Sequence, residues 1–419
     1  MRQARRFIAI LGLTAAACCA LAQGQSAKRY AWVASWGASQ QIPEPQNALP
    51  MDDLRDATVR QIVHLSLGGL ALRLHLSNAF GTQALHFTSV HVAHPVSRAS
   101  SAIDPSSDRA LTFAGKPDVT IPPGAEYVSD PVEMTVTPLS DVAVTFHLDE
   151  PPARETGHPG SRATTYYVHG GQVSGADLPD AKHVDHWYNI AEIDVQVDAR
   201  NAPRAGVVVA LGDSITDGHA ATTNGNDRWP DVLAARLQAG KKTRNVGVSN
   251  QGIGGNHLLT DGLGPNALAR FDRDVLAPAG VRWLIVFEGV NDLGGLARTG
   301  EVPAEQHAVW VERLIAAFEQ IIVRAHAHGL RVYGATITPF IGSDYYHPDA
   351  QTEADRQAVN AWIRAAGHFD AVLDFDAVVR DPEHPDRLLA AYDSGDHLHP
   401  GPAGYKAIGD SVPLSLFGK

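Results

Sequence analysis

Apolar and polar residues alternate at every second position through much of the first half of the chain. Residues 70–76 read LALRLHL, and residues 142–148 read VAVTFHL. A two-residue period is typical of strands that bury one face and expose the other. Turn-forming stretches such as IPPG at residues 121–124 separate these segments. The pattern predicts an antiparallel β-sandwich, jelly-roll-like, over residues 29–198.

The pattern changes after a linker at residues 198–204. Short, continuously apolar segments now alternate with longer segments whose apolar residues recur at helical spacing, which is typical of a parallel sheet covered by helices on both faces. We therefore predict an α/β domain over residues 204–419, with its functional loops at the carboxyl ends of the strands. The predicted strands are residues 207–211, 244–248, 283–287, 331–337 and 371–375, and the predicted helices are residues 229–238, 306–328 and 353–366.

The first 22 residues have the composition of a secretory signal peptide. Three arginines precede an apolar run, and ALA at residues 20–22 supplies the small residues of a cleavage site. Both cysteines, Cys18 and Cys19, lie in this segment, so we expect an exported chain, periplasmic or extracellular, with neither a disulfide nor a cysteine nucleophile. A lipid anchor on Cys18 is the alternative, although Ala15 stands where such a signal prefers a larger aliphatic residue.

The charge of the chain restricts its partners. It carries 34 Lys and Arg against 46 Asp and Glu, a net charge of −12, and cleavage of the signal peptide would leave 31 against 46, a net charge of −15. Such a protein repels nucleic acid phosphates and anionic membrane surfaces. We expect a neutral or small substrate, a small molecule or a carbohydrate ester, with no nucleic acid and no stable membrane insertion. The sequence leaves the oligomeric state open.

The first predicted strand of the α/β domain leads into GDSITDG at residues 212–218. A serine at this position, Ser214, lies on a sharp turn between strand and helix, where its hydroxyl is exposed and its N–H faces the space of a developing oxyanion. Asp213 is expected to cap the turn. The alternative is that this segment is only a helix cap without chemistry.

Two further loops at the same predicted edge offer hydrogen-bond donors. NQGIGGN at residues 250–256 can present backbone N–H groups to a negative charge, or it is merely a turn. Its spacing and its place in the second βα loop disfavour a dinucleotide site. In EGVND at residues 288–292, the Asn291 amide can stabilise an oxyanion at any working pH. We interpret Glu288 and Asp292 as supporting groups of the turn.

DHLHP at residues 396–400 pairs an aspartate with a histidine three residues later. On one tight turn, Asp396 can accept the Nδ1–H of His399 and leave Nε2 free to take a serine proton. His397 is too close to Asp396 in sequence for that geometry, so we expect it to shape the loop. A metal site built on Asp396, His397 and His399 is the alternative, but the sequence lacks the further ligand clusters of a hydrolytic metal centre.

These four blocks, in this order, resemble those of the SGNH/GDSL hydrolase superfamily over roughly residues 206–419. The resemblance implies a flavodoxin-like three-layer fold and a carboxylic ester hydrolase. It assigns Ser214 as nucleophile and first oxyanion donor, Gly255 and Asn291 as the second and third donors, His399 as base and Asp396 as its orienting acid. It implies no metal and no cofactor. The assignment of Gly255 rather than Gly254 depends on counting five residues from Asn250.

The amino-terminal half resembles, more weakly, a bacterial subgroup similar to xylanase-associated acylesterases, through WVASWG at residues 32–37, VRQ at 59–61 and LSNAFG at 76–81. This implies removal of O-acetyl groups from carbohydrate. A lipase or arylesterase acting on small acyl esters is one alternative, and an inactive carbohydrate-binding protein is another. The aromatic residues of this half either stack on sugars or fill the sandwich core: Trp32, Trp36, Tyr166, Tyr167, Trp187 and Tyr188.

Overall fold

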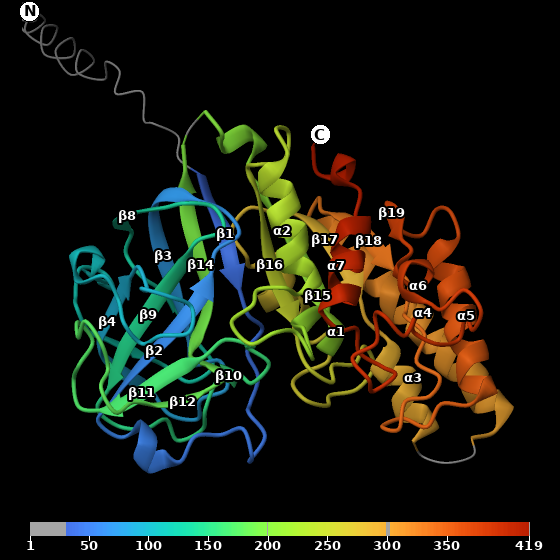
Figure 1. Cartoon of the computed structure of the whole chain (residues 1–419), viewed down its shortest axis with the longest axis horizontal. Coiled ribbons are helices and arrows are strands. Elements are labelled where there is room, and N and C mark those ends of the chain that lie inside the picture. The colour runs from blue at the N-terminus through green and yellow to red at the C-terminus, as the bar shows by residue number, and fades with distance from the viewer. Residues whose placement is uncertain (1–30, 199, 299–301, 419) are drawn as a thin grey trace, which may run out of the picture.

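The computed structural model describes residues 31–198, 200–298 and 302–418. The predicted signal peptide, with Cys18 and Cys19, lies outside the described residues. The chain has two parts that lie side by side, an antiparallel part in blue and green and a parallel α/β part in yellow to red (Figure 1). No helix in the described ranges is both long enough and apolar enough to cross a membrane.

Two antiparallel sheets build the first part. One has the order β1–β14–β3–β7, with β8 also paired to β3, and the other has the order β12–β11–β2–β9–β4–β5, with β6 also paired to β4. The strands of the first sheet are β1 (Ala31–Gly37), β3 (Gly69–Ser77), β7 (Glu126–Val128), β8 (Val132–Val136) and β14 (Ile190–Val197). Those of the second are β2 (Ala57–His64), β4 (Leu85–Ala93), β5 (Arg109–Ala110), β6 (Val119–Ile121), β9 (Asp141–Leu148), β11 (Thr165–His169) and β12 (Lys182–Val184). A separate pair joins β10 (Gly157–His158) to β13 (Trp187–Tyr188).

The alternating segments of the sequence form central strands of these sheets. Residues 70–76 lie in β3 and residues 142–148 in β9, and Leu72, Leu74, Val142 and Val144 are fully buried. The opposite face of β9 is buried as well, since Ala143, Thr145 and His147 are at most 9% exposed, so the alternation separates the apolar core from a second, more polar buried face. The antiparallel β-rich region predicted for this half is confirmed.

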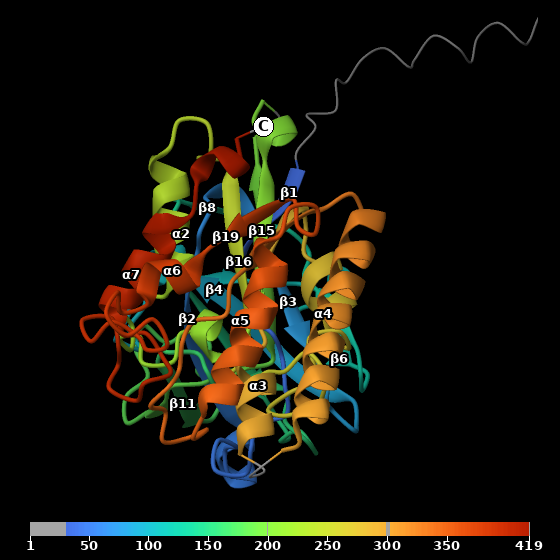
Figure 2. The ribbon, with the colours of Figure 1, turned by 90° about the vertical axis from the view of Figure 1, so that its right-hand side faces the viewer.

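The second part is built on a five-stranded sheet of order β16–β15–β17–β18–β19, all parallel. This is the flavodoxin-like order 2-1-3-4-5, so the predicted fold class is confirmed. The strands are β15 (Gly206–Gly212), β16 (Val246–Gly252), β17 (Val281–Phe287), β18 (Arg331–Ala335) and β19 (Ala371–Leu373). The helices are α1 (Ser214–Asp217), α2 (Trp229–Ala239), α3 (Val290–Ala297), α4 (Ala304–Ala327), α5 (Ala350–Arg364), α6 (Phe375–Val379) and α7 (Pro402–Ser411). Figure 2 shows α2 and α7 on one side of the strands and α4 on the other.

Element boundaries differ from the sequence predictions where polar or small residues continue a strand. The second parallel strand runs over Val246–Gly252 and not 244–248, because its last residues still pair with β15 although they are polar. The helices α3, α6 and α7 were not predicted, since each is short. Short 3₁₀ helices cover Met51–Leu54, Pro105–Ser107, Ala202–Arg204 and Leu414–Leu416, and a π-helix covers Asp272–Leu276.

The antiparallel part covers the open edge of the parallel sheet at β16. The N–H of Val248 donates to Ser66 Oγ at 2.8 Å, and the N–H of Ser66 donates to Ser35 O at 2.8 Å. Gly247 allows this approach, because a Cβ there would lie 2.6 Å from Ala34 O. Buried apolar side chains form one continuous cluster through both parts. An exposed strand edge is therefore avoided and the two parts share a core.

Candidate active site

The nucleophile candidate Ser214 lies where β15 gives way to α1. Asp213 caps the helix, as predicted, by accepting the N–H of Ile215 at 2.9 Å. Ser214 is the first residue of this short helix and is 6% exposed. The helix ends at Gly218, whose φ of 98° is a left-handed conformation that glycine adopts without strain. The sharp turn thus presents the serine side chain at the carboxyl edge of the sheet.

Ser214, His399 and Asp396 are joined by two hydrogen bonds, although 185 positions separate the serine from the histidine. Ser214 Oγ lies 2.8 Å from His399 Nε2, and His399 Nδ1 lies 2.6 Å from Asp396 Oδ2. His399 is 8% exposed. This is the geometry in which an imidazole can take a proton from a hydroxyl while a carboxylate fixes its orientation.

The turn at residues 393–399 holds the carboxylate of Asp396 ready for this contact. Its other oxygen, Oδ1, accepts the backbone N–H groups of Leu398 and His399 at 3.0 and 2.8 Å. Burial raises the pKa of Asp396, but the hydrogen bonds from the ring and the backbone of His399 outweigh it and hold the pKa well below its usual range. The ring of His397 points to Asp393 Oδ2 at 2.6 Å, away from the serine, in keeping with the loop-shaping role predicted for it.

The glycine-rich loop after β16 is tied to the serine turn. Asn250 Nδ2 donates to Thr216 O at 2.8 Å, and the N–H of Ile253 donates to Gly212 O at 3.0 Å. The N–H of Gly254 donates to Asp217 Oδ2 at 3.2 Å. Within the part of the chain that the structure describes, the N–H of Gly255 has no acceptor. This difference favours Gly255 over Gly254 as the donor available to a ligand.

Asn291 is the second residue of α3, at the carboxyl end of β17, and is 2% exposed. Its amide is fixed on both sides, because Nδ2 donates to Asn256 O at 2.7 Å and Oδ1 accepts the hydroxyl of Tyr346 at 2.6 Å. One N–H of Nδ2 remains for a ligand. Sequence analysis did not identify Tyr346, because it lies in a loop 55 positions away from Asn291.

Three buried carboxyls support the serine, glycine and asparagine loops from behind. Burial raises the pKa of Asp213 and of Asp292 to about 7 in each case, and it raises that of Glu288 as well. Asp292 accepts the N–H groups of Leu258 and Leu259 at 2.9 and 3.0 Å. These contacts agree with the supporting role that we predicted for Glu288 and Asp292.

Arg270 connects the same loops through a fully buried guanidinium. It donates to Gly212 O at 3.0 Å, to Asn256 Oδ1 at 2.9 Å and to Glu288 Oε1 at 3.3 Å. Its Nη1 also reaches Asp274 Oδ2 at 3.0 Å. Nη1 also donates to Ser39 Oγ at 2.7 Å, so the partners come from five separate segments, and no motif marked this arginine in the sequence.

The antiparallel part contributes His158 to the serine turn. His158 Nε2 lies 2.9 Å from Asp217 Oδ1, and its Nδ1 lies 2.8 Å from Ser39 O. Both side chains of the pair are almost fully buried. Asp217 therefore links His158, through its two oxygens, to the backbone of Gly254 beside the candidate donor Gly255.

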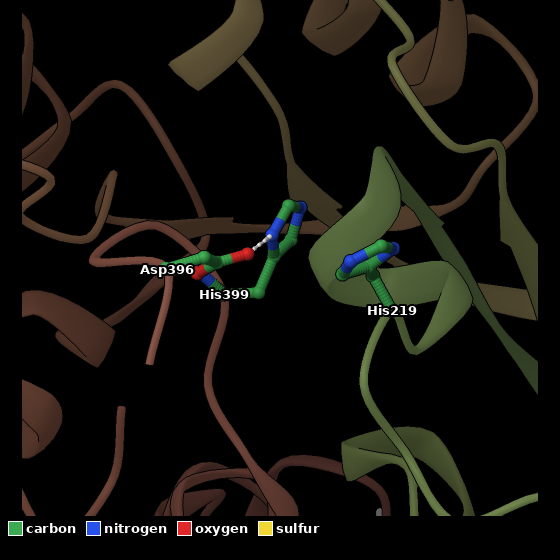
Figure 3. A group of neighbouring side chains, drawn as sticks. All are labelled: His219, Asp396 and His399. Carbon is green, nitrogen blue, oxygen red and sulfur yellow. Dashed lines mark hydrogen bonds and ion pairs between the residues drawn. The ribbon is translucent and has the colours of Figure 1, made fainter. Parts of the chain in front are cut away.

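His219 flanks the base on the side away from Asp396 (Figure 3). Its ring centroid lies 4.1 Å from that of His399, and the backbone N–H of His219 donates to Ser214 O at 2.9 Å. Although His219 is partly exposed, desolvation of its ring by the surrounding protein, followed by the neighbouring His399 and Arg162, lowers the pKa of His219 to about 4, so the ring is neutral at neutral pH. Sequence analysis did not single out this residue.

Two groups of side chains in the described ranges have the composition of metal ligands. His219, Asp396 and His399 offer ligand atoms within 4.8 Å of one another, and so do His75, Glu192 and Asp194. Members of both groups are also hydrogen-bonded to one another, His399 to Asp396 at 2.6 Å in the first group and His75 to Asp194 at 3.1 Å in the second. The proposed metal alternative with His397 does not form, since that ring faces Asp393.

The aromatic residues of the antiparallel part are mostly core residues. Trp36, Tyr167, Trp187 and Tyr188 are at most 8% exposed, and Trp36 packs edge-on against Trp187 at 4.9 Å. Burial of these rings favours the core interpretation over a sugar-stacking face. Trp32 is only partly buried, with Arg73 over its ring at 4.8 Å.

Residues 210–407 match a family model described as the GDSL-like Lipase/Acylhydrolase family. Similar solved structures include a putative lipolytic protein of the G-D-S-L family from Desulfitobacterium hafniense, with 24% identity over 49% of this chain and 96% of that one and a TM-score of 0.36. An acetylxylan esterase from Geobacillus stearothermophilus has 20% identity over 52% and 97%, with a TM-score of 0.37. A putative acylhydrolase from Bacteroides fragilis has 20% identity over 52% and 92%, with a TM-score of 0.37. No curated protein matches the chain.

Proposed function

We propose, from the match of residues 210–407 to the GDSL-like lipase/acylhydrolase family model, that the protein is a serine esterase with Ser214 as nucleophile, His399 as base and Asp396 as the group that orients it. The observation that carries the proposal is the pair of hydrogen bonds from Ser214 Oγ to His399 Nε2 at 2.8 Å and from His399 Nδ1 to Asp396 Oδ2 at 2.6 Å. A serine hydroxyl becomes a strong nucleophile only when such a base removes its proton.

The proposed reaction has two steps. Ser214 Oγ attacks the ester carbonyl while His399 takes its proton, and the alcohol then leaves with that proton to give an acyl-enzyme. Water, deprotonated by His399, then attacks the acyl carbonyl; the bond to Ser214 Oγ breaks, Oγ takes the proton back from His399, and the acid is released. The oxyanion of each tetrahedral intermediate is stabilised by the N–H groups of Ser214 and Gly255 and by the amide of Asn291. The firm hydrogen bonds of Asn291 to Asn256 and Tyr346 support this role, because a donor that is already oriented loses no free energy on ordering.

For the substrate, we propose O-acetyl groups on carbohydrate. The side chains that border the triad are polar and open to solvent: His219 is exposed, and the Asp396 and His397 side chains are 41% and 56% exposed. A polar rim suits a hydroxyl-rich alcohol portion better than a long acyl chain. The signal-like residues 1–22 support an exported enzyme that meets such polymers outside the cytoplasm.

The test combines active-site labelling with a substrate series. A fluorophosphonate probe is expected to label the wild type and not Ser214→Ala, as shown by peptide mass spectrometry. Rates on p-nitrophenyl esters of increasing chain length, and acetate release from acetylated xylan, are expected to favour acetyl groups. Activity that rises with chain length would instead support a lipase. A folded wild type that neither reacts with the probe nor releases acetate would support an inactive carbohydrate-binding protein.

A further inference from the structure

One arginine of the antiparallel part reaches the rim of the candidate active site. Arg162 lies in the loop between β10 and β11, and its Nη2 donates to Nδ1 of His219 at 3.1 Å. His219 in turn packs on His399, with ring centroids 4.1 Å apart (Figure 3). The guanidinium is therefore separated from the proposed base by a single imidazole ring.

The loop holds Arg162 in a fixed and unfavourable backbone conformation. Its φ of 49° is left-handed, which costs a non-glycine residue on the order of 1–3 kcal/mol. Asn224 of the parallel part pins the loop, because its N–H donates to Arg162 O at 2.8 Å and its side chain bonds to the backbone and the hydroxyl of Thr164 at 2.9 Å. Strain that the surroundings maintain in this way is typical of residues that bind ligands.

The charge of Arg162 has no counter-ion among the described residues. No carboxylate lies within ion-pair distance of its guanidinium, and its Nε is buried without a hydrogen-bond acceptor. Its one recorded partner is the ring of His219. A cation without a counter-ion is stabilised when an anion binds, and the planar guanidinium fork, whose outer nitrogens carry more N–H groups than the one given to His219, matches a carboxylate.

The position of Arg162 relative to His399 determines which part of an ester it meets. The leaving alcohol takes its proton from the imidazole, so it departs on the imidazole side of the site. The donors Gly255 and Asn291, which come from the other loops, bind the carbonyl oxygen. His219 and Arg162 therefore flank the alcohol portion and not the acyl portion.

We propose that Arg162 binds a carboxylate on the alcohol portion of the ester, so that the preferred substrates are acylated sugars that carry a uronic acid group. This inference rests on the proposed esterase function and narrows its substrate class. It also gives the antiparallel part a direct role in specificity.

The test compares a matched pair of substrates, an O-acetylated methyl glucuronoside and the corresponding O-acetylated methyl glucoside. The wild type is expected to have the higher kcat/KM on the acidic sugar. Arg162→Gln is expected to lose about 10- to 100-fold on the acidic sugar, the range for a charge-assisted hydrogen bond, and less than about threefold on the neutral one. Arg162→Lys should retain part of the preference. The control is Arg109→Gln, an exposed arginine on β5 at the opposite edge of the sheet from β11, which should change neither rate.

Equal losses of Arg162→Gln on both sugars, at an unchanged melting temperature, would overturn the proposal. A p-nitrophenyl hemisuccinate carries its carboxylate on the acyl portion, and a dependence on Arg162 found only with this ester would refute the assignment to the alcohol side. Calorimetric binding of methyl glucuronoside to Ser214→Ala and to Ser214→Ala/Arg162→Gln needs no turnover. Methyl glucuronoside is expected to bind Ser214→Ala more tightly than Ser214→Ala/Arg162→Gln even if the esterase proposal fails. Equal affinity of the two proteins would contradict the role of Arg162.

Discussion

The two parts of this molecule contribute to the candidate site in different ways. The parallel part supplies Ser214, Gly255 and Asn291 from the carboxyl ends of three neighbouring strands, where all parallel strands point the same way and their loops converge. The antiparallel part has no such common edge. It instead supplies His158 and Arg162, which contact the loops of the parallel part from outside. Reactive groups thus come from one part, and groups that hold or surround them come from the other.

Substitutions of the reactive groups in the parallel part are expected to lower kcat far more than substitutions in the antiparallel part. Ser214→Ala and His399→Ala should each lower kcat on p-nitrophenyl acetate by about 10⁴- to 10⁶-fold, because the nucleophile and its base act as a unit. Ser106→Ala, an exposed serine of the antiparallel part, is the control and should keep the wild-type rate. Steady-state kinetics, with melting temperatures to verify folding, measure this. Substantial turnover by Ser214→Ala would refute the proposed mechanism.

A second prediction concerns the oxyanion donors. Asn291→Ala is expected to lower kcat by about 10²- to 10³-fold with little change in KM, because a donor to the oxyanion acts mainly in the transition state. Tyr346→Phe keeps the amide and loses only the hydroxyl that orients it, so its loss should be about tenfold or less. An Asn291→Ala enzyme with unchanged kcat and a raised KM would show that the amide binds ground-state substrate only.

The contact between the two parts is tested at His158. His158→Ala leaves the carboxylate of Asp217 buried without its partner, which is expected to reduce the free energy of unfolding by about 1–3 kcal/mol. Because Asp217 also holds Gly254, kcat should fall about tenfold at constant KM. His158→Gln can still donate a hydrogen bond to Asp217, so it should recover part of the lost stability and part of the lost kcat. Denaturant unfolding and kinetics measure the two effects, and loss of stability with full kcat would confine His158 to a structural role.

The reactive groups could be predicted from the sequence, whereas the groups that hold or surround them could not. Ser214, Asp396 and His399 each stand in a short motif, and Asp396 reaches His399 over three residues of a single turn. The alternation of apolar strands and helices predicted the parallel α/β class, whereas the flavodoxin-like strand order was implied only by the family resemblance. His158, Arg162 and Tyr346 were missed because each contacts a residue more than 50 positions away, and no local pattern records such a contact. Arg270 was missed for the same reason, since its partners come from several loops.

The smallest expected effect concerns the buried carboxyls behind the site, and it appears in stability rather than rate. The pKa of Asp213 in the folded protein is raised by burial to about 7, whereas an unfolded aspartate releases its proton near pH 4. Folding therefore takes up a proton between about pH 4 and 7. The contribution of Asp213 to the free energy of unfolding is therefore greatest at the acidic end of this interval. It declines as pH rises through the interval, by at most about 1.4 kcal/mol per pH unit.

Asp213→Asn removes the titration while keeping the oxygen that caps Ile215. Between pH 5 and 7, the free energy of unfolding of this variant should therefore decline less steeply with pH than that of the wild type, by up to about 1.4 kcal/mol per pH unit, the slope that one proton contributes. Asp52→Asn, at an exposed aspartate of the antiparallel part, should leave the slope unchanged. Urea unfolding at pH 5, 6 and 7 gives the slopes directly. Parallel curves for Asp213→Asn and the wild type would mean that Asp213 is ionised in the folded protein and that its charge is compensated by Arg270, whose side chain reaches the same loop at Gly212.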